Sequence, residues 1–146
     1  LKLGNFSSNF SNYISTPNKI LRVFFPVKIG DSEEYFHGYR VQHNNLLGPY
    51  KGGMRYYPNV SEEESISLAT WMTLKNSLLR LPLGGGKGGL DIDPTKYKKE
   101  DLKIITKSFI QEIYPNIGPF IDIPAPDMGT NSEIIDWMAN EYQNLQ

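Results

Sequence analysis

The sequence predicts an α/β domain, a layered mixed β-sheet flanked by helices, and two observations carry this. Apolar residues alternate with other residues over 19–29 and again over 34–42, which indicates an antiparallel hairpin near the N-terminus. Strand and helix patterns then alternate through the second half of the chain, as they do in layered α/β domains. The 146 residues fit one domain.

The hairpin is bounded by turn residues at 30–33. Pro26 cannot donate a backbone hydrogen bond, so the first strand is expected at a sheet edge or with a bulge. Residues 1–18, rich in Asn and Ser, are expected to form a loosely structured segment or a short helix. Residues 19–146 would then form the domain itself.

A third extended segment is predicted over 51–57. Ser61 and Glu64 make a capping box that opens a helix over about 62–79. A further helix is expected over about 95–114, with an apolar stripe of Leu102, Ile105, Phe109 and Ile113.

The C-terminal part is expected to hold a buried strand and a last helix. Residues 117–123 read as the strand. Thr130 and Glu133 form a second capping box, which would open the helix.

Composition excludes several classes of site and partner. Without cysteine there is no disulfide, thiolate nucleophile or cysteine-ligated metal, and two histidines are too few for most histidine-built metal sites, so no metal is expected. Fifteen basic and sixteen acidic residues leave a charge of −1, which argues against nucleic acid or an anionic membrane as partner. No apolar run has the length of a membrane span and no secretory pattern opens the chain, so a cytoplasmic location is expected.

The glycine run at 84–89 surrounds Lys87. Gly84, Gly86 and Gly89 fit the dinucleotide-binding spacing, but no helix pattern follows directly, and Gly88 stands where a phosphate loop needs Ser or Thr. One interpretation is a flexible turn with a solvated lysine. We favour the other, a functional lysine where a backbone or ligand comes close, because so many glycines cost backbone entropy.

Two further lysines are candidates. Lys75 shares a helical stripe with Leu68, Met72 and Leu79, so it either snorkels at the edge of the core or meets an anion. Lys51 adjoins two glycines, which leave its surroundings open to a ligand. The alternative interpretation is a hairpin turn with an exposed lysine.

Asp127 follows a segment stiffened by two prolines. Brought near the lysines, its carboxylate would be a proton-transfer partner; in the alternative interpretation it is an ordinary aspartate at the start of a helix. Three lysines and this carboxylate together suggest a pocket for a small anion. Two of the lysines could hold carboxylates, and the third, crowded by them, would exchange protons near neutral pH.

Three motifs, which follow one another in the family's order, resemble those of the glutamate, leucine, phenylalanine and valine dehydrogenases. They are Gly-Tyr-Arg-Val-Gln-His at 38–43, the segment 81–94 around the glycine run, and Asp-Ile-Pro-Ala-Pro-Asp at 122–127. The resemblance covers the chain from about Ile20 and is greatest to the N-terminal, substrate-binding and oligomerisation domain of hexameric glutamate dehydrogenases.

The resemblance implies catalytic roles for two residues. Lys87 would activate the water that adds to the iminium carbon and take its proton. Asp127 would shuttle protons to and from the amino group.

The resemblance also implies a substrate pocket. Lys75 would bind the α-carboxylate with Met72 beside it, and Lys51 would bind the side-chain carboxylate with Gly53 nearby. Relatives acting on apolar amino acids have an apolar residue where Lys51 stands, so Lys51 favours L-glutamate. The alternatives are a branched-chain or aromatic amino-acid dehydrogenase domain, or a non-catalytic binding or oligomerisation module.

The resemblance further implies NAD or NADP as cofactor, bound mainly by a second, nucleotide-binding domain that these 146 residues do not include. No cofactor-binding residue is therefore expected here, and the isolated chain is expected to be inert. The expected partners are L-glutamate, 2-oxoglutarate, ammonium and further copies of the chain, as a hexamer in the family and a dimer or larger for this piece. Aromatic residues at 35, 36 and 39 suggest a strand face that pairs with another subunit.

Overall fold

The computed structural model describes residues 8–146 and contains a five-stranded mixed sheet in the order β1-β2-β4-β3-β5. β2 is antiparallel to both of its neighbours, β1 and β4, whereas β3 runs parallel to both β4 and β5. The predicted fold class is therefore confirmed. The strands are β1 (Lys19–Ile29), β2 (Ser32–Asn44), β3 (Tyr50–Tyr57), β4 (Gly84–Asp91) and β5 (Asp122–Pro126). The helices are α1 (Ser8–Ser15), α2 (Glu62–Leu78), α3 (Lys99–Ile113) and α4 (Ser132–Asn144), with short 3₁₀ turns η1 (Pro94–Lys96) and η2 (Tyr114–Asn116).

The N-terminal hairpin forms as predicted. β1 has the predicted bounds, and its edge position accommodates Pro26. Two residues, Gly30 and Asp31, separate the strands, and Gly30 has a φ of +59°, which glycine adopts without steric cost. α1 lies in the segment 1–18, for which a loosely structured segment or a short helix is expected, and residues 1–7 lie outside the described residues.

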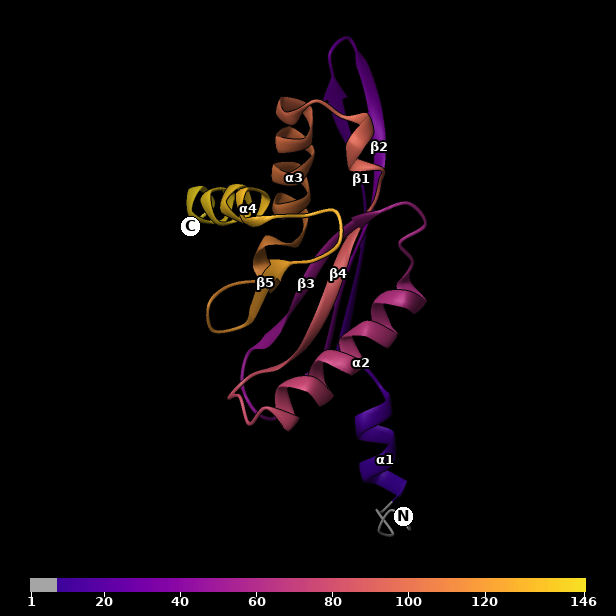
Figure 1. Cartoon of the computed structure of the whole chain (residues 1–146), viewed down its shortest axis with the longest axis vertical. Coiled ribbons are helices and arrows are strands. Elements are labelled where there is room, and N and C mark those ends of the chain that lie inside the picture. The colour runs from indigo at the N-terminus through magenta and orange to yellow at the C-terminus, as the bar shows by residue number, and fades with distance from the viewer. Residues whose placement is uncertain (1–7) are drawn as a thin grey trace.

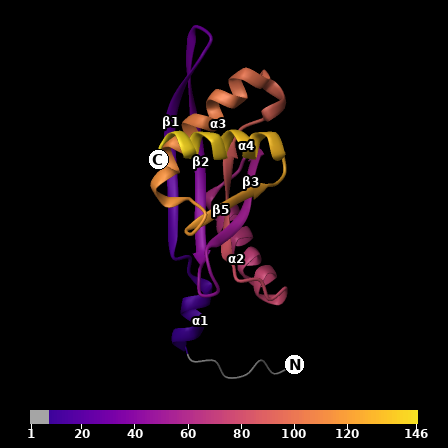
Figure 2. The same cartoon turned by 90° about the vertical axis from the view of Figure 1, so that its left-hand side faces the viewer.

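The sheet is covered differently on its two faces. Figure 1 shows α2 crossing one side of the sheet and α3 with α4 on the other. A β-carbon placed at Gly85 would lie 2.6 Å from the Ala69 carbonyl of α2, whereas one at Gly38 would lie 2.6 Å from the Phe109 ring of α3. Figure 2 shows the hairpin reaching beyond one end of the sheet and α1 at the opposite end.

The apolar core lies between the sheet and α3 and α4. All four residues of the predicted stripe on α3 are buried there. Tyr56 extends the core, with its hydroxyl within 3.1 Å of Thr106 Oγ1. Besides Tyr56, the least exposed residues of this core are Phe25, Met54, Leu90, Ile105, Phe109, Ile110 and Ile113.

The face that α2 turns to the sheet differs from the predicted stripe. Its buried residues are Ser65, Ala69 and Asn76, while Lys75 and Leu79 are exposed. Small and polar side chains line this face because the helix packs closely on glycines of β4. The predicted cap at Ser61 is confirmed, since its side chain accepts a hydrogen bond from the Glu64 N–H.

Three boundaries in the second half differ from prediction. The strand predicted at 117–123 begins only at Asp122, because Gly118, with a φ of +144°, turns the chain first. The segment with two prolines before Asp127 is the edge strand β5, where prolines are tolerated. The helix predicted from 95 begins at Lys99, after the turn η1.

The N-cap residue of the last helix, α4, also differs from the prediction. Asn131, not Thr130, accepts the hydrogen bond of the first turn, from the Ile134 N–H. Across the described residues, 8–146, no helix is both long and apolar enough to cross a membrane.

Candidate active site

The glycine run forms β4, a strand in the interior of the sheet, so its interpretation as a turn is wrong. The prediction of close backbone approach is confirmed. A β-carbon at Gly89 would lie 1.8 Å from the Arg55 carbonyl, and one at Gly85 would lie 2.0 Å from Thr73 Oγ1. The run therefore lets β3 and α2 lie unusually close to β4, and Lys87 is the one residue in it with a side chain.

Lys87 points to the α2 face and is buried, with 5% of its surface exposed. Its Nζ lies 2.8 Å from Asp127 Oδ2. Burial lowers the pKa of Lys87, and the nearby charges of Arg55 and Arg40 add to this, against the opposing effect of Asp127. The sequence predicted a lowered pKa from crowding by lysines; the structure assigns it first to burial, and then to arginines.

Asp127 directly follows β5 and is partly exposed. Its Oδ2 also accepts a hydrogen bond of 2.8 Å from Arg55 Nε. Its backbone N–H donates to Thr130 Oγ1, whose hydroxyl contacts the Met54 carbonyl, so Thr130 fixes the loop rather than capping α4. Burial would raise the pKa of Asp127, but the hydrogen bonds from Lys87 and Arg55 outweigh it and lower that pKa.

Gly53 faces this ion pair from β3. A β-carbon there would lie 2.6 Å from Asp127 Cβ and 3.2 Å from Lys87 Nζ. The absence of a side chain at Gly53 therefore lets Asp127 and Lys87 lie close to β3.

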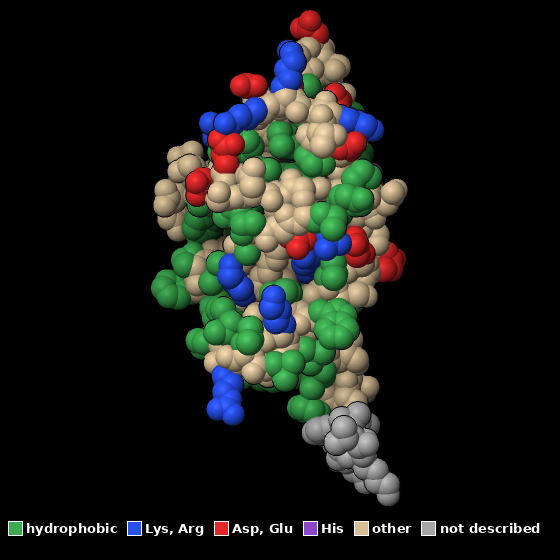
Figure 3. Space-filling view, in the orientation of Figure 1, with side chains coloured by type: hydrophobic (Ala, Val, Ile, Leu, Met, Phe, Trp, Pro, Cys, Tyr) green, Lys and Arg blue, Asp and Glu red, His purple; other side chains and the backbone are tan. Residues whose placement is uncertain are grey.

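Met72 and Lys75 approach the same region from α2. Met72 Cγ lies 3.3 Å from where a β-carbon of Gly52 would be. Lys75 is exposed, follows Met72 by about one turn, and shares with it a hollow along the outer side of α2. No residue within 8–146 forms an ion pair or hydrogen bond with the Lys75 ammonium. Figure 3 shows Lys and Arg side chains gathered in the middle of this face among apolar ones.

Lys51 is half-buried on β3, two residues before Gly53 and therefore on the same face. Its Nζ donates to the Pro124 carbonyl at 3.4 Å. Burial lowers the pKa of Lys51, and the charge of Arg40 adds to this, whereas Asp122 opposes it. The structure thus brings Lys87, Asp127 and Gly53 into direct proximity, with Lys51 on the same face of β3 and Met72 close to Gly52. Lys75 borders a hollow together with Met72 on α2.

Two arginines of this region were not among the predicted site residues. Arg55 joins Asp127 to Glu64 of α2, with a hydrogen bond of 2.6 Å to Glu64 Oε1. Arg40 of β2 forms a wholly buried ion pair with Asp122 of β5. The one sequence signal was that Arg40 lies in the motif at 38–43, and its partner Asp122 in the motif at 122–127; Arg55 lies in none of the motifs.

The sequence matches the family described as Glu/Leu/Phe/Val dehydrogenase, dimerisation domain, over residues 17–144. The chain belongs to this family.

Relatives of this dehydrogenase domain include two curated glutamate dehydrogenases. It is 44% identical to the NADP(+)-dependent glutamate dehydrogenase of Pyrobaculum calidifontis over 146 residues, 99% of this chain and 35% of that protein. It is 43% identical to the NAD-specific glutamate dehydrogenase of Staphylococcus aureus over 145 residues, 99% of this chain and 35% of that protein. The chain thus spans about a third of the length of these relatives.

A solved structure agrees with these relatives. The glutamate dehydrogenase of Peptoniphilus asaccharolyticus superposes with a TM-score of 0.94 at 37% identity, over 96% of this chain and 36% of that one. This confirms the resemblance to glutamate dehydrogenases and the fold expected from it.

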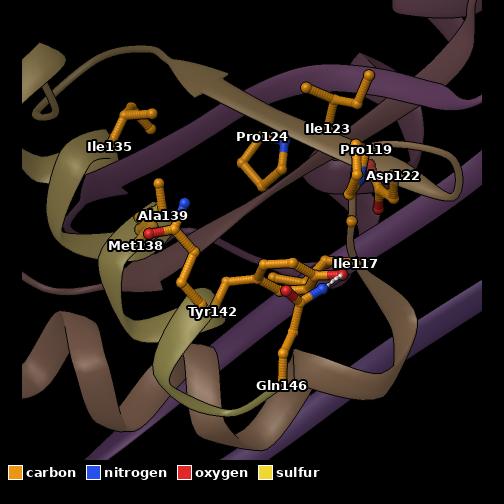
Figure 4. Close-up of a pocket in the computed structure, with 12 residues that line it drawn as sticks. Ile117, Pro119, Asp122, Ile123, Pro124, Ile135, Met138, Ala139, Tyr142 and Gln146 are labelled. Carbon is orange, nitrogen blue, oxygen red and sulfur yellow. Dashed lines mark hydrogen bonds between the residues drawn. The ribbon is translucent and has the colours of Figure 1, made fainter.

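The domain has another pocket, of about 410 Å³, between β5, the segment 117–119 that precedes it, and α4. Figure 4 shows it bordered by Met138 and Ala139 of α4, with Gln146 donating a hydrogen bond of 3.2 Å to the Tyr142 hydroxyl. None of the predicted site residues lines this pocket.

Proposed function

We propose that this chain is the substrate-binding and assembly domain of an NAD(P)-dependent glutamate dehydrogenase. Such an enzyme interconverts L-glutamate with 2-oxoglutarate and ammonium. The observation that carries the proposal is the buried Lys87, 2.8 Å from Asp127, on the face of the sheet to which Lys51 also belongs. The glutamate dehydrogenases among its relatives support it.

Lys87 and Asp127 have the chemistry that the reaction needs. A lysine whose pKa is lowered by burial holds a larger share of the free amine, which can take the proton of the water that adds to the iminium carbon. An ionised Asp127 can accept a proton from the substrate ammonium and return it.

The two other lysines fit the two carboxylates of glutamate. The exposed ammonium of Lys75 would bind the α-carboxylate, with Met72 beside it. The half-buried Lys51 would bind the side-chain carboxylate, on the same face of β3 as Gly53. Burying Lys51 against an apolar substrate would leave its charge unpaired, which disfavours branched-chain and aromatic substrates.

The residues described do not fit a nicotinamide nucleotide. Gly84, Gly86 and Gly89, which match the dinucleotide spacing, lie within a central strand instead of opening a helix. NAD or NADP, which the names of the two curated relatives support, would therefore be bound mainly by residues beyond these 146. On this proposal the isolated chain does not turn over substrate.

We also propose that the chain assembles with further copies, as a hexamer in the complete enzyme, and works in the cytoplasm. The family description as a dimerisation domain supports assembly. Exposed aromatic rings on the hairpin provide a surface for it: Phe24 and Tyr35 are 58% and 56% exposed. This exposed aromatic surface differs from the predicted one at residues 35, 36 and 39, because Phe36 is buried in the core.

The test is oxidation of NADH and NADPH by the complete protein that carries this chain, with ammonium and either 2-oxoglutarate or 2-oxoisocaproate. Turnover with 2-oxoglutarate that Lys87→Ala abolishes and Lys96→Ala, an exposed lysine, leaves intact supports the proposal. Turnover with 2-oxoisocaproate alone contradicts the assignment of Lys51. No turnover with either substrate would favour a non-catalytic module.

A further inference from the structure

The carboxylate of Asp127 is held through one oxygen. Lys87 Nζ and Arg55 Nε both contact Oδ2, each at 2.8 Å. Within residues 8–146, no group donates a hydrogen bond to Oδ1. Oδ2 thus has two cationic partners, and Oδ1 remains available to a ligand.

Arg55 is itself fixed from two sides. Its Nη1 donates to Glu64 Oε1 of α2 at 2.6 Å, and only 17% of its side chain is exposed. Its backbone lies in β3 beside Gly89, where glycine permits close contact. Two anchored ends restrict the rotamers of the guanidinium, so Nε is held in place before substrate arrives.

Lys87 alone would not hold Asp127 in this way. An ammonium group on a flexible stem is a point charge that imposes little orientation, whereas a guanidinium has donors in a fixed plane. Lys87 must also be the free amine before it can accept the proton of the water, and in that form it no longer neutralises Asp127. Arg55 stays charged throughout, because its pKa is raised by Asp127 and Glu64 against the effect of burial.

We propose, resting on the proposed function, that Arg55 is a positioning residue that fixes Asp127 through Oδ2 and so assigns proton exchange with the substrate nitrogen to Oδ1. Arg55 does not contact the substrate in this role. It acts through the orientation and the charge state of Asp127.

The sign of the expected pH effect follows from the charges around the pair. Asp127 faces Lys87 from β4 and Arg55 from β3, and Glu64 of α2 lies beyond Arg55. Removing Arg55 takes away a hydrogen bond and a positive charge that both lower the pKa of Asp127. It also takes away a charge that lowers the pKa of Lys87. Both groups then titrate at higher pH.

The experiment measures kcat and KM for 2-oxoglutarate, and the pH profile of kcat/KM, in the complete protein with Arg55→Met. We expect kcat to fall by roughly 10- to 100-fold with KM little changed. The acidic limb of the profile should move to higher pH by about one unit. Arg55→Lys, which keeps the charge but cannot reach both Asp127 and Glu64, should lie between the wild type and Arg55→Met.

Arg22→Met is the matched control, because Arg22 pairs with Glu62 on the first turn of the same helix but is 66% exposed. It should leave kcat and the pH profile unchanged. A lower kcat in Arg55→Met with an unmoved acidic limb would contradict the positioning role and indicate structural damage alone.

Should Arg55→Met fail to fold, a wild-type kcat and profile in Arg55→Lys would contradict the proposal. A lowered kcat with a raised acidic limb in that variant would support it. Failure of the proposed function appears separately, as wild-type protein that does not turn over 2-oxoglutarate at all.

Discussion

Arg40 and Asp122 form an ion pair between β2 and β5 in which both side chains are fully buried. Arg40 Nε donates to Asp122 Oδ2 at 2.8 Å, and Nη1 lies 3.3 Å from the carbonyls of Gly52 and Gly53. Gln42 adds a hydrogen bond of 3.0 Å to Asp122 Oδ2. The pair therefore supports Gly52 and Gly53, the stretch of β3 on which the site rests.

Removing one charge of this pair should destabilise the domain strongly. Asp122→Asn leaves the Arg40 guanidinium buried without a counter-charge, which costs about 3–5 kcal/mol. Denaturant unfolding of the 146-residue chain measures this. Glu62→Gln, which breaks the exposed pair with Arg22, is the matched control and should cost less than about 1 kcal/mol. Equal losses in the two variants would contradict the structural role of the buried pair.

Gly53→Ala should impair catalysis more than stability. The added methyl would lie 2.6 Å from Asp127 Cβ and 3.2 Å from Lys87 Nζ, so it displaces the two groups. Misplacing catalytic groups by about an ångström lowers kcat by roughly 100-fold. Gly30→Ala, in an open turn with φ of +59°, is the control and should lower stability without changing kcat. An unchanged kcat in Gly53→Ala would argue against the site as described.

Lys87→Met should abolish turnover yet leave the domain at least as stable at pH 7. The folded-state pKa of Lys87 lies below its usual value, chiefly through burial, so its charged form is disfavoured in the folded state. This cost is fully present below the folded pKa and disappears as pH rises to the unfolded pKa. The stability difference between wild type and variant should therefore shrink toward alkaline pH in unfolding experiments. A variant less stable than the wild type by about 2 kcal/mol or more at pH 7 would show that the ion pair with Asp127 dominates.

Assembly should depend on the exposed rings of the hairpin. Phe24 and Tyr35 are stacked with ring centroids 5.4 Å apart and face solvent. Sedimentation of the 146-residue chain should show a dimer or larger, and Phe24→Ser should shift it toward monomer. Phe120→Ser, which removes an 89% exposed ring elsewhere, is the control. A monomeric wild type, or equal effects of the two substitutions, would place the interface elsewhere.

The hairpin and the core helix α3 could be predicted because their apolar residues recur with the period of the element that they form, two residues in a strand and about 3.6 in a helix. β1 has the predicted bounds, and the stripe on α3 is buried as expected. β4 could not be recognised as a strand, since five of the six residues at 84–89 have no side chain and show no period.

The site was predictable in part for a similar reason. Lys87 stood out because glycines surround it. Arg55 did not, because its partner Asp127 is 72 residues away and the contact exists only after β3 and β5 pair. Likewise, Arg40 and Asp122 are 82 residues apart, and neither carries a local signal that it is buried.

The most direct test of the central claim, that this face of the domain selects glutamate, is the ratio of kcat/KM for 2-oxoglutarate to that for 2-oxoisocaproate. It is measured in the complete protein and in Lys51→Leu, with Lys96→Leu as an exposed-lysine control. We predict that wild type strongly prefers 2-oxoglutarate, and that Lys51→Leu lowers the ratio by on the order of 100-fold, because a buried charge partner is lost. A ratio that Lys51→Leu leaves unchanged would contradict the account.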